Sequence, residues 1–198
     1  KNFALSDAYQ QTREIGMNLF METKYSWEES LPIAEATSLS EIEKFGKSLY
    51  NNTFLEVMVY GDFEEKDAKK VVTLFQDKTK TKGIEKSEAF NIKYLEFDGT
   101  ETIQYVNNLL VNNSCFYREY LVGKDSPELR AATKVIGSAL QQPFFTEMRT
   151  NQQLGYIVGS YPNNKEKSYY LSLLIQSGEY TADDVNERAD KFISSTPK

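Results

Sequence analysis

The stretch QPFFTEMRTNQQLGYIV, residues 142–158, joins a helical pattern to a strand pattern within one short segment. Pro143 breaks or kinks the helix before it and starts a further helical turn, which Arg149 ends. Gly155 breaks any helix that continues, and Tyr156 opens a strand of β-branched and aromatic residues. The stretch therefore predicts a helix that leads directly into a β-strand.

A returning strand and a final helix follow this stretch. Residues 162–165, Pro-Asn-Asn-Lys, have turn chemistry, and residues 168–176 form the apolar run SYYLSLLIQ. Thr181 with Asp184 three positions later is a capping pattern for a last helix. The apolar side of that helix consists of Val185, Ala189, Phe192 and Ile193.

A long helix is predicted before the stretch. Ser126, Pro127 and Glu128 combine a capping serine, a proline at the first helical position and an early acid. Its expected buried stripe consists of Leu129, Ala132, Val135, Ile136, Ala139 and Leu140.

Several further runs are predicted to be strands. Residues 54–60 read FLEVMVY, a short and nearly continuous apolar run that is typical of a buried strand. Residues 92–97 are predicted to form another strand. Residues 102–111 and 115–122 are predicted to form a hairpin around Asn112, Asn113 and Ser114.

The first part of the chain is predicted to be rich in helices. Apolar residues spaced three and four apart indicate a helix over residues 8–20. Trp27 lies in a short polar stretch that Pro32 interrupts. Ser40 with Glu43 is a capping-box pattern for a second helix with the stripe Ile42, Phe45 and Leu49. A third helix is predicted to begin at the acids Glu64, Glu65 and Asp67.

The pattern changes between residues 77 and 91, where lysines alternate with Thr, Gly, Ser and Glu. This composition is typical of a solvated linker. We therefore expect two partial domains, residues 1–76 and residues 92–198. Both mix helices with strands, so the predicted fold class is α+β, with antiparallel sheets packed by helices.

Composition excludes several classes of function. The chain has 198 residues, a net charge of −6 and a pI of about 4.9, which argues against nucleic acid or an anionic membrane as a partner. No apolar run approaches the roughly 20 residues of a membrane span. The chain starts with Lys1 and shows no leader pattern, so we expect an internal piece of a longer polypeptide.

The chain contains no histidine and only one cysteine, Cys115. Imidazole-based triads and histidine-containing zinc sites are therefore excluded within it, and no internal disulfide is possible. No Asp/Glu cluster has calcium-loop spacing, and no phosphate-binding glycine motif occurs. A lone thiol in a β-rich run is typical of a small buried hydrophobe. We thus expect no metal ligand in this chain.

Three stretches together carry a resemblance to a known family. They are ALSDAYQQ at residues 4–11, the region of residues 112–120, and residues 142–158. With them the chain resembles the pitrilysin and insulin-degrading-enzyme (insulinase) family of zinc metallopeptidases. The resemblance implies four homologous α+β domains of the LuxS/MPP-like type, in two halves that close around an unfolded peptide.

The resemblance also implies where this chain belongs in such an enzyme. The zinc would lie in the first domain, and this chain would be the later part of the third domain and the early part of the fourth. Zinc would then be a cofactor of the parent enzyme and not be bound by this chain. The implied partners are peptide substrates and the zinc-bearing N-terminal half of the same polypeptide, in the bacterial periplasm or the cytosol.

Within the family, an arginine and a tyrosine of the third stretch reach the substrate near the scissile bond. Here these residues are Arg149 and Tyr156, as supporting catalytic and substrate-binding residues, with Gly155 allowing close approach of the substrate. A guanidinium suits a peptide carbonyl, and a phenol can donate to a developing oxyanion. Gln153 and Leu154 are expected to be structural, and so are three residues of the first stretch, Ser6, Asp7 and Tyr9.

Other interpretations of these residues stay open. An arginine that ends a helix is commonly a dipole partner, and a tyrosine that opens a strand commonly packs in a core. The chain could also belong to a non-catalytic subunit or scaffold of the same fold, or be a free-standing peptide-binding module. The retained arginine and tyrosine favour the substrate-binding part of an active peptidase.

Overall fold

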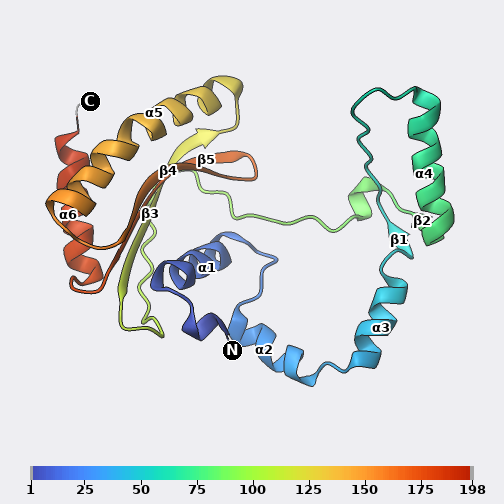
Figure 1. The fold of residues 1–198 in the computed structure, drawn as a ribbon, viewed down its shortest axis with the longest axis horizontal. Coiled ribbons are helices and arrows are strands. Elements are labelled where there is room, and N and C mark those ends of the chain that lie inside the picture. The colour runs from blue at the N-terminus through green and yellow to red at the C-terminus, as the bar shows by residue number, and fades with distance from the viewer. Residues whose placement is uncertain (1, 197–198) are drawn as a thin grey trace. The chain divides into compact units, whose positions relative to one another are not determined.

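The computed structural model describes residues 2–196 and divides the chain into two compact units (Figure 1). One unit consists of Lys1–Ser26 together with Lys93–Lys198, and the other of Trp27–Ile92. The first unit holds the whole 142–158 stretch. We describe each unit by itself.

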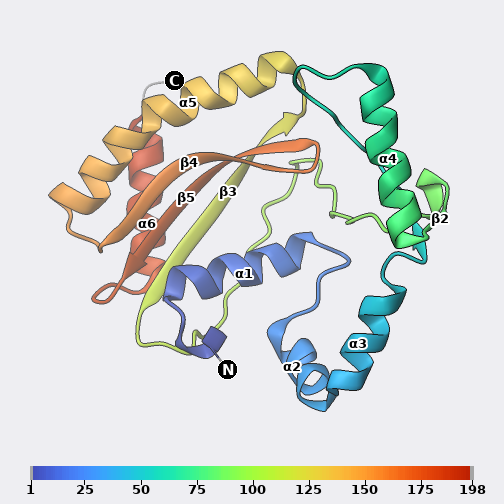
Figure 2. The ribbon, with the colours of Figure 1, turned by 45° about the vertical axis from the view of Figure 1, so that its right-hand side comes forward.

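A three-stranded antiparallel sheet organises the first unit (Figure 2). Its strands are β3 (Ser114–Lys124), β4 (Ile157–Lys165) and β5 (Ser168–Ser177), in the order β3-β5-β4. The β4–β5 hairpin pairs Ile157 with Gln176 and continues without a register shift to Lys165 and Ser168. The sheet therefore places β5 in the centre and leaves β4 at an edge.

Helices α5 (Pro127–Phe145) and α6 (Ala182–Ser195) cover one face of this sheet. Ser126 caps α5 by accepting the Leu129 N–H at 3.1 Å, and Thr181 caps α6 by accepting the Asp184 N–H at 3.2 Å. Their inward side chains form the hydrophobic core with alternate residues of β3 and β5. The core consists of Phe116, Phe144, Met148, Leu154, Leu173, Ile175, Val185 and Ala189.

Helix α1 (Ala8–Phe20) packs against the other face of the sheet, after the short 3-10 helix η1 (Asn2–Leu5). Its Tyr9 N–H donates to the side chain of Gln176 on β5 at 2.8 Å. A buried ion pair, Lys165 with Glu119, lies on this face, and their side chains are 4% and 6% exposed. Burial lowers the pKa of Lys165, and the carboxylate opposes that effect. Further contacts of the pair come from Phe20, Tyr117, Asn163, Tyr170 and Ser172.

The second unit contains three helices and two very short strands. The helices are α2 (Trp27–Ala36), α3 (Leu39–Ser48) and α4 (Glu65–Thr79). Strands β1 (Asn52–Thr53) and β2 (Lys82–Gly83) pair in parallel, and the 3-10 helix η2 (Lys86–Glu88) follows them. No helix in the described residues 2–196 is both long and apolar enough to cross a membrane.

The structure confirms the α+β class, with an antiparallel sheet packed by helices. The predicted helices over residues 8–20, 126–140 and 181–193 are present, as are the strands after Tyr156 and over residues 168–176. Each of these elements has a start or stop signal close by in the sequence.

Three of the predicted strands are wrong. Residues 54–60 form no strand, and Met58 and Tyr60 are 87% and 89% exposed. Residues 92–97 contribute only an isolated bridge between Met21 and Tyr94. The predicted hairpin of residues 102–111 with 115–122 does not form, because β3 pairs with β5 instead. A strand needs a neighbour, and among residues 2–196 these three runs have no sheet to join.

Four local predictions also need correction. The polar stretch at Trp27 is helix α2, which contains Pro32. The capping box of α3 uses Ser38 and Glu41, two residues before the predicted pair. Residues 162–165 belong to β4 and do not form a turn, since an edge strand tolerates proline.

The fourth correction concerns the buried stripe of α5. The buried residues are Thr133, Gly137 and Phe144, whereas Val135 is 68% exposed and Ile136 is also exposed. A Cβ on Gly137 would lie 2.7 Å from Cδ of Pro162. The helix thus approaches β4 through its smallest residue, and this close approach determines which side is buried.

The compact units do not follow the predicted linker at residues 77–91. Helix α1 packs with the sheet of residues 93–198, so the first unit combines residues from both sides of that linker. The division into residues 1–76 and 92–198 describes family domains and not compact units, and it stays a prediction.

Candidate functional site

The candidate site lies where α5 passes into β4. Helix α5 continues through Pro143 into a π-helix, η3 (Thr146–Asn151). The chain then turns at Gln153, whose φ is 53°, and buries Leu154, whose N–H donates to the Met148 carbonyl at 3.0 Å. Single-turn π-helices are frequent at functional sites. The burial of Leu154 agrees with its expected structural role.

Glu147 holds the π-helix and the turn after it together. Its carboxylate accepts the Asn151 side-chain N–H at 2.7 Å and the Gln152 side-chain N–H at 2.8 Å. These two hydrogen bonds lower the pKa of Glu147. Arg188 of α6 donates to the side-chain oxygen of Gln152 at 2.8 Å, and its guanidinium carbon lies 4.7 Å from the centre of the Tyr180 ring. Side chains from η3 and α6 therefore fix the turn from both sides.

Gly155 lies against the main chain of the central strand. A Cβ at this position would be 1.8 Å from the Gln176 carbonyl oxygen and 2.9 Å from its carbon. Glycine is thus required here by the approach to β5, whatever lies on the opposite side. The predicted role of Gly155 in the approach of substrate remains a hypothesis.

Arg149 and Tyr156 come together at the surface. The guanidinium carbon of Arg149 lies 5.4 Å from the centre of the Tyr156 ring, a cation–π distance. Arg149 is half-buried, and Tyr156 is 81% exposed. Tyr156 is therefore not a core residue, and the rigid turn presents both side chains to solvent side by side.

The residues predicted to support α1 have such contacts. Ser6 donates to the Phe3 carbonyl at 2.6 Å, and the Asp7 N–H donates to the Gln10 side chain at 3.1 Å. These contacts fix the start of α1.

A groove at the start of β4 was not predicted from the sequence. It lies between α5 and the start of β4 and has a volume of about 360 Å³. Its lining residues are Ser138, Gln141, Gln142, Phe145, Val158 and Gly159. Glu147 and Arg188 were also missed. The bonds of Glu147 are local, to residues four and five positions later, whereas only the tertiary fold brings Arg188 to the turn.

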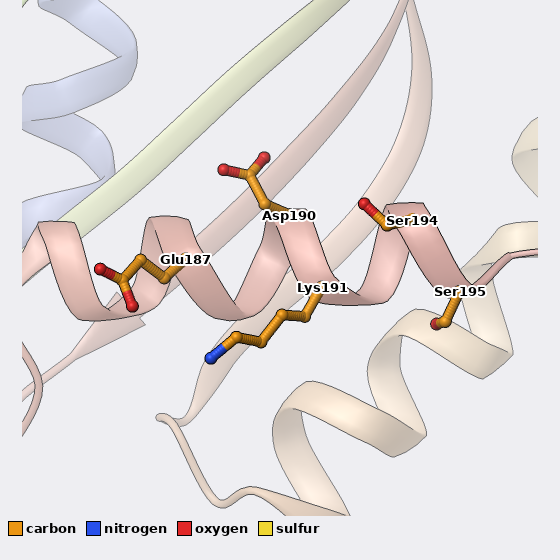
Figure 3. A pocket seen from close by; sticks show the side chains of 5 residues that line it. All are labelled: Glu187, Asp190, Lys191, Ser194 and Ser195. Atoms are coloured by element: carbon orange, nitrogen blue, oxygen red, sulfur yellow. The ribbon is translucent and has the colours of Figure 1, made fainter.

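A second hollow lies on α6 and has a volume of about 560 Å³ (Figure 3). All five lining side chains, from Glu187 to Ser195, come from that one helix. Among them, Asp190 already pairs with Arg118 of β3. One exposed helix face does not enclose a ligand, so this hollow is not a candidate site.

Comparison with known proteins extends these observations. A family model described as PQQ synthase PqqF-like, C-terminal lobe domain 4, matches residues 135–198. The Nardilysin-like protein of Arabidopsis thaliana is 23% identical over 89% of this chain and 18% of its own length. Protease 3 of Escherichia coli (strain K12) is 25% identical over 85% of this chain and 17% of its own length. The crystal structure of pitrilysin matches 98% of this chain and 20% of that chain, with 20% identity and a TM-score of 0.73.

The resemblance to the pitrilysin and insulin-degrading-enzyme family is confirmed. The pitrilysin family is a family of zinc metallopeptidases. The similarity to the crystal structure of pitrilysin shows that this chain has the same fold. The chain spans about a fifth of the length of these relatives, 17–18% for the two named above.

The residues described here do not fit the zinc of the pitrilysin family. Among residues 2–196 there is no group of three or more His, Cys, Asp or Glu side chains that could hold a metal ion. Burial raises the pKa of the Cys115 thiol from 9.0 to about 11, so it is not an activated nucleophile. The chemistry that the site can offer is hydrogen-bond donation and cationic binding by Arg149 and Tyr156.

Proposed function

We propose that this chain is the substrate-holding part of a zinc metalloendopeptidase that degrades peptides in a closed chamber. The zinc and the general base would be supplied by the N-terminal half of the same polypeptide. Relatives named as proteases support this proposal, among them the Putative zinc protease C28F5.4 of Caenorhabditis elegans, 24% identical over 98% of this chain and 23% of its own length.

The observation that carries the proposal is the exposed Arg149–Tyr156 pair. A tyrosine that opened the strand only to pack in the core would be buried. Tyr156 is instead 81% exposed on a turn whose conformation is fixed by Glu147 and Arg188. Binding and catalysis require side chains that face the solvent and are held in a fixed geometry.

Arg149 would mainly bind the substrate, and Tyr156 would mainly stabilise the transition state. The planar guanidinium of Arg149 can donate to a peptide carbonyl and orient the substrate. The Tyr156 hydroxyl can donate to the oxygen of the scissile carbonyl as that oxygen gains negative charge. The second contact strengthens only as the reaction proceeds, so it should affect kcat more than KM.

Peptide hydrolysis by the complete polypeptide with zinc tests this proposal. Tyr156→Phe should lower kcat by about 10²-fold with little change in KM. Arg149→Lys keeps the charge but loses the fork, and it should mainly raise KM. Tyr105→Phe is the matched control, since Tyr105 is an exposed tyrosine elsewhere in the same unit and should behave like wild type.

Two results would contradict the proposal. An active enzyme that is indifferent to Tyr156→Phe would leave this tyrosine without a catalytic role. A wild-type polypeptide that is inactive with zinc supplied would instead indicate a non-catalytic subunit of the same fold.

A further inference from the structure

A hydrogen bond joins the start of helix α1 to the end of strand β5. The main-chain N–H of Tyr9 donates to the side-chain oxygen of Gln176 at 2.8 Å, across 167 positions of the sequence. The first N–H groups of a helix have no acceptor within that helix. Gln176 therefore supplies, from the sheet, an acceptor that the helix cannot supply itself.

Two further contacts hold the start of α1 in this place. Gln11 is only 1% exposed, and its side chain donates to the Ser6 carbonyl at 2.9 Å and accepts the Leu110 N–H at 3.2 Å. The Thr12 side chain forms a hydrogen bond with the Cys115 thiol. The start of α1 is therefore a fixed point, bound to the beginning of β3 and to the segment before it.

The end of the sheet that α1 reaches is the end that carries the candidate site. Gln176 pairs with Cys115 of β3 on one side and with Ile157 of β4 on the other. Ile157 is the first residue of β4 and directly follows Tyr156. The row of the sheet that contains Gln176 is thus the row at which the turn enters the sheet.

The main chain of Gln176 also limits where the turn can lie. Gly155 approaches so closely that a Cβ would be 1.8 Å from the Gln176 carbonyl oxygen. A displacement of this carbonyl would therefore be transmitted to Gly155 and to the adjacent Tyr156. Because the side chain of Gln176 contacts α1 and its main chain contacts the turn, this one residue connects the two.

The end of β5 is held from both faces of the sheet. Side chains of a strand alternate in direction, so Ser177 points away from α1. Its hydroxyl accepts the Tyr180 N–H at 2.9 Å, and the residue is only 1% exposed. Chain ends of an element open most easily when nothing fixes them. Ser177 on one face and Gln176 on the other fix this strand end beside the turn.

We propose that Gln176 is a positioning residue for the peptide hydrolysis, and that it acts by fixing the end of β5 to α1 and thereby placing Tyr156. Its contribution would be geometric, since a small misplacement of a reacting group lowers the rate of the chemical step. This inference rests on the proposed function and adds to it a residue that reaches the reaction only through another side chain.

Peptide hydrolysis by the complete polypeptide with zinc tests the inference. Gln176→Met loses the acceptor and keeps the length of the side chain. It should lower kcat about fivefold with little change in KM, the size expected for one hydrogen bond. Gln176→Glu keeps an acceptor, and its charge suits the positive end of a helix, so its kcat should stay near that of wild type.

Ser126→Ala is the matched control for lost stability. Ser126 also caps a helix, by accepting the Leu129 N–H at 3.1 Å. This cap follows the end of β3, where Lys124 pairs with Ser168 at the opposite end of β5 from Gln176. Ser126→Ala should lower the Tm by a similar amount and leave kcat unchanged, so a fall in kcat for Gln176→Met alone reports on the site.

A double-mutant cycle with Tyr156→Phe identifies the group through which Gln176 acts. If Gln176 places the Tyr156 hydroxyl, Gln176→Met should lower kcat about fivefold in the wild-type background and have no effect once that hydroxyl is removed. Losses that multiply independently would mean that Gln176 does not act through Tyr156, and they would contradict the inference.

Hydrogen exchange followed by mass spectrometry gives a readout without turnover. In Gln176→Met, the amides of residues 154–157 should exchange about fivefold faster than in wild type, whereas Ser126→Ala should leave them unchanged. If circular dichroism shows that Gln176→Met does not fold, Gln176→Asn replaces it, because its amide is a methylene too short to reach the Tyr9 N–H.

Three further results would overturn the inference. They are a wild-type kcat in Gln176→Met, equal falls in kcat for Gln176→Met and Ser126→Ala, and unchanged exchange of residues 154–157 in Gln176→Met. The proposed function is judged separately, because a wild-type kcat in Tyr156→Phe contradicts that function. Hydrogen exchange then still decides whether Gln176 holds the turn.

Discussion

Replacing Gly155 with alanine should disrupt the site through the main chain. The new Cβ would lie 1.8 Å from the Gln176 carbonyl oxygen, 2.9 Å from the Gln176 carbonyl carbon and 3.4 Å from the Ser177 Cα. The φ of Gly155 is not positive, so alanine can adopt this backbone conformation. The cost of the substitution therefore arises from the steric clash and not from torsional strain. Either the turn or the end of β5 must move.

The magnitude follows from what obstructs the Cβ. Inserting a methyl group into a packed region typically costs about 1–3 kcal/mol when flexible side chains can shift. Here the obstacle is the backbone of the central strand, which pairs with both β3 and β4. We therefore expect a loss at or above the upper end, about 3 kcal/mol, or roughly a hundredfold in the local folding equilibrium.

Hydrogen exchange followed by mass spectrometry on the complete polypeptide measures this loss region by region. In Gly155→Ala, the amides of η3 and of β5 should exchange faster, whereas those of α4 should not change. Gly16→Ala and Gly46→Ala are matched controls. A Cβ on Gly16 would meet the Tyr117 ring at an ordinary 3.6 Å, and one on Gly46 meets nothing within 4 Å. Both lie in helices, where alanine stabilises by roughly 0.5–1 kcal/mol.

The reasoning would be refuted by normal protection of η3 and β5 in Gly155→Ala, or by an equal loss in Gly16→Ala. If protection falls as expected, peptide hydrolysis should fall with it, since the displaced residue is the neighbour of Tyr156. A variant with normal protection and lost hydrolysis would instead assign Gly155 to the approach of substrate.

Three further outcomes follow from the fold. Lys165→Met should destabilise by about 3–5 kcal/mol in urea unfolding, because it leaves the buried Glu119 carboxylate without its cation, and adding Glu119→Leu should recover much of the loss. Ser126→Ala should cost about 1 kcal/mol in the same assay, since the Leu129 N–H loses its capping oxygen. Cys115 should react with iodoacetamide at about pH 8 roughly a hundredfold more slowly than a free thiol, as mass spectrometry would show, because its pKa is raised from 9.0 to about 11. The thiol's contribution to stability is present below pH 9.0 and is lost as the pH rises toward about 11, because the unfolded state ionises first.

The elements that could be predicted from the sequence are those with local signals. Ser126 and Thr181 cap their helices as their residue types indicate, and the β-branched and aromatic run after Tyr156 does form a strand. These signals act within four residues, so a single sequence contains all the information that they need.

The predictions that were wrong depended on partners far along the chain. Residues 54–60 have the composition of a buried strand, yet composition cannot supply a neighbouring strand. The stripe on α5 is wrong for a related reason. The contact of Gly137 with Pro162 places the helix, and the periodicity of the helix does not contain Pro162.

The residues of the candidate site also differ in whether the sequence alone could identify them. Arg149 and Tyr156 were selected from the sequence by a family resemblance, and the structure places them in contact. Their support by Arg188 was missed, because its hydrogen bond to Gln152 joins residues 36 positions apart. Glu147 was missed although its partners, Asn151 and Gln152, are only four and five positions away. No local pattern marks β4 as an edge strand either, since an edge exists only once the strand order is known.

The construction of the turn favours a binding role for the pair that it carries. Tyr156 follows a buried leucine and a glycine fixed by the Gln176 carbonyl, and Arg149 belongs to a π-helix fixed by Glu147. A turn that served only as a connection would not need constraints from β5, η3 and α6 at once. These constraints hold a guanidinium and a phenol in one arrangement at the surface. That arrangement reduces the entropy lost when a peptide binds, which is the physical advantage of a preorganised site.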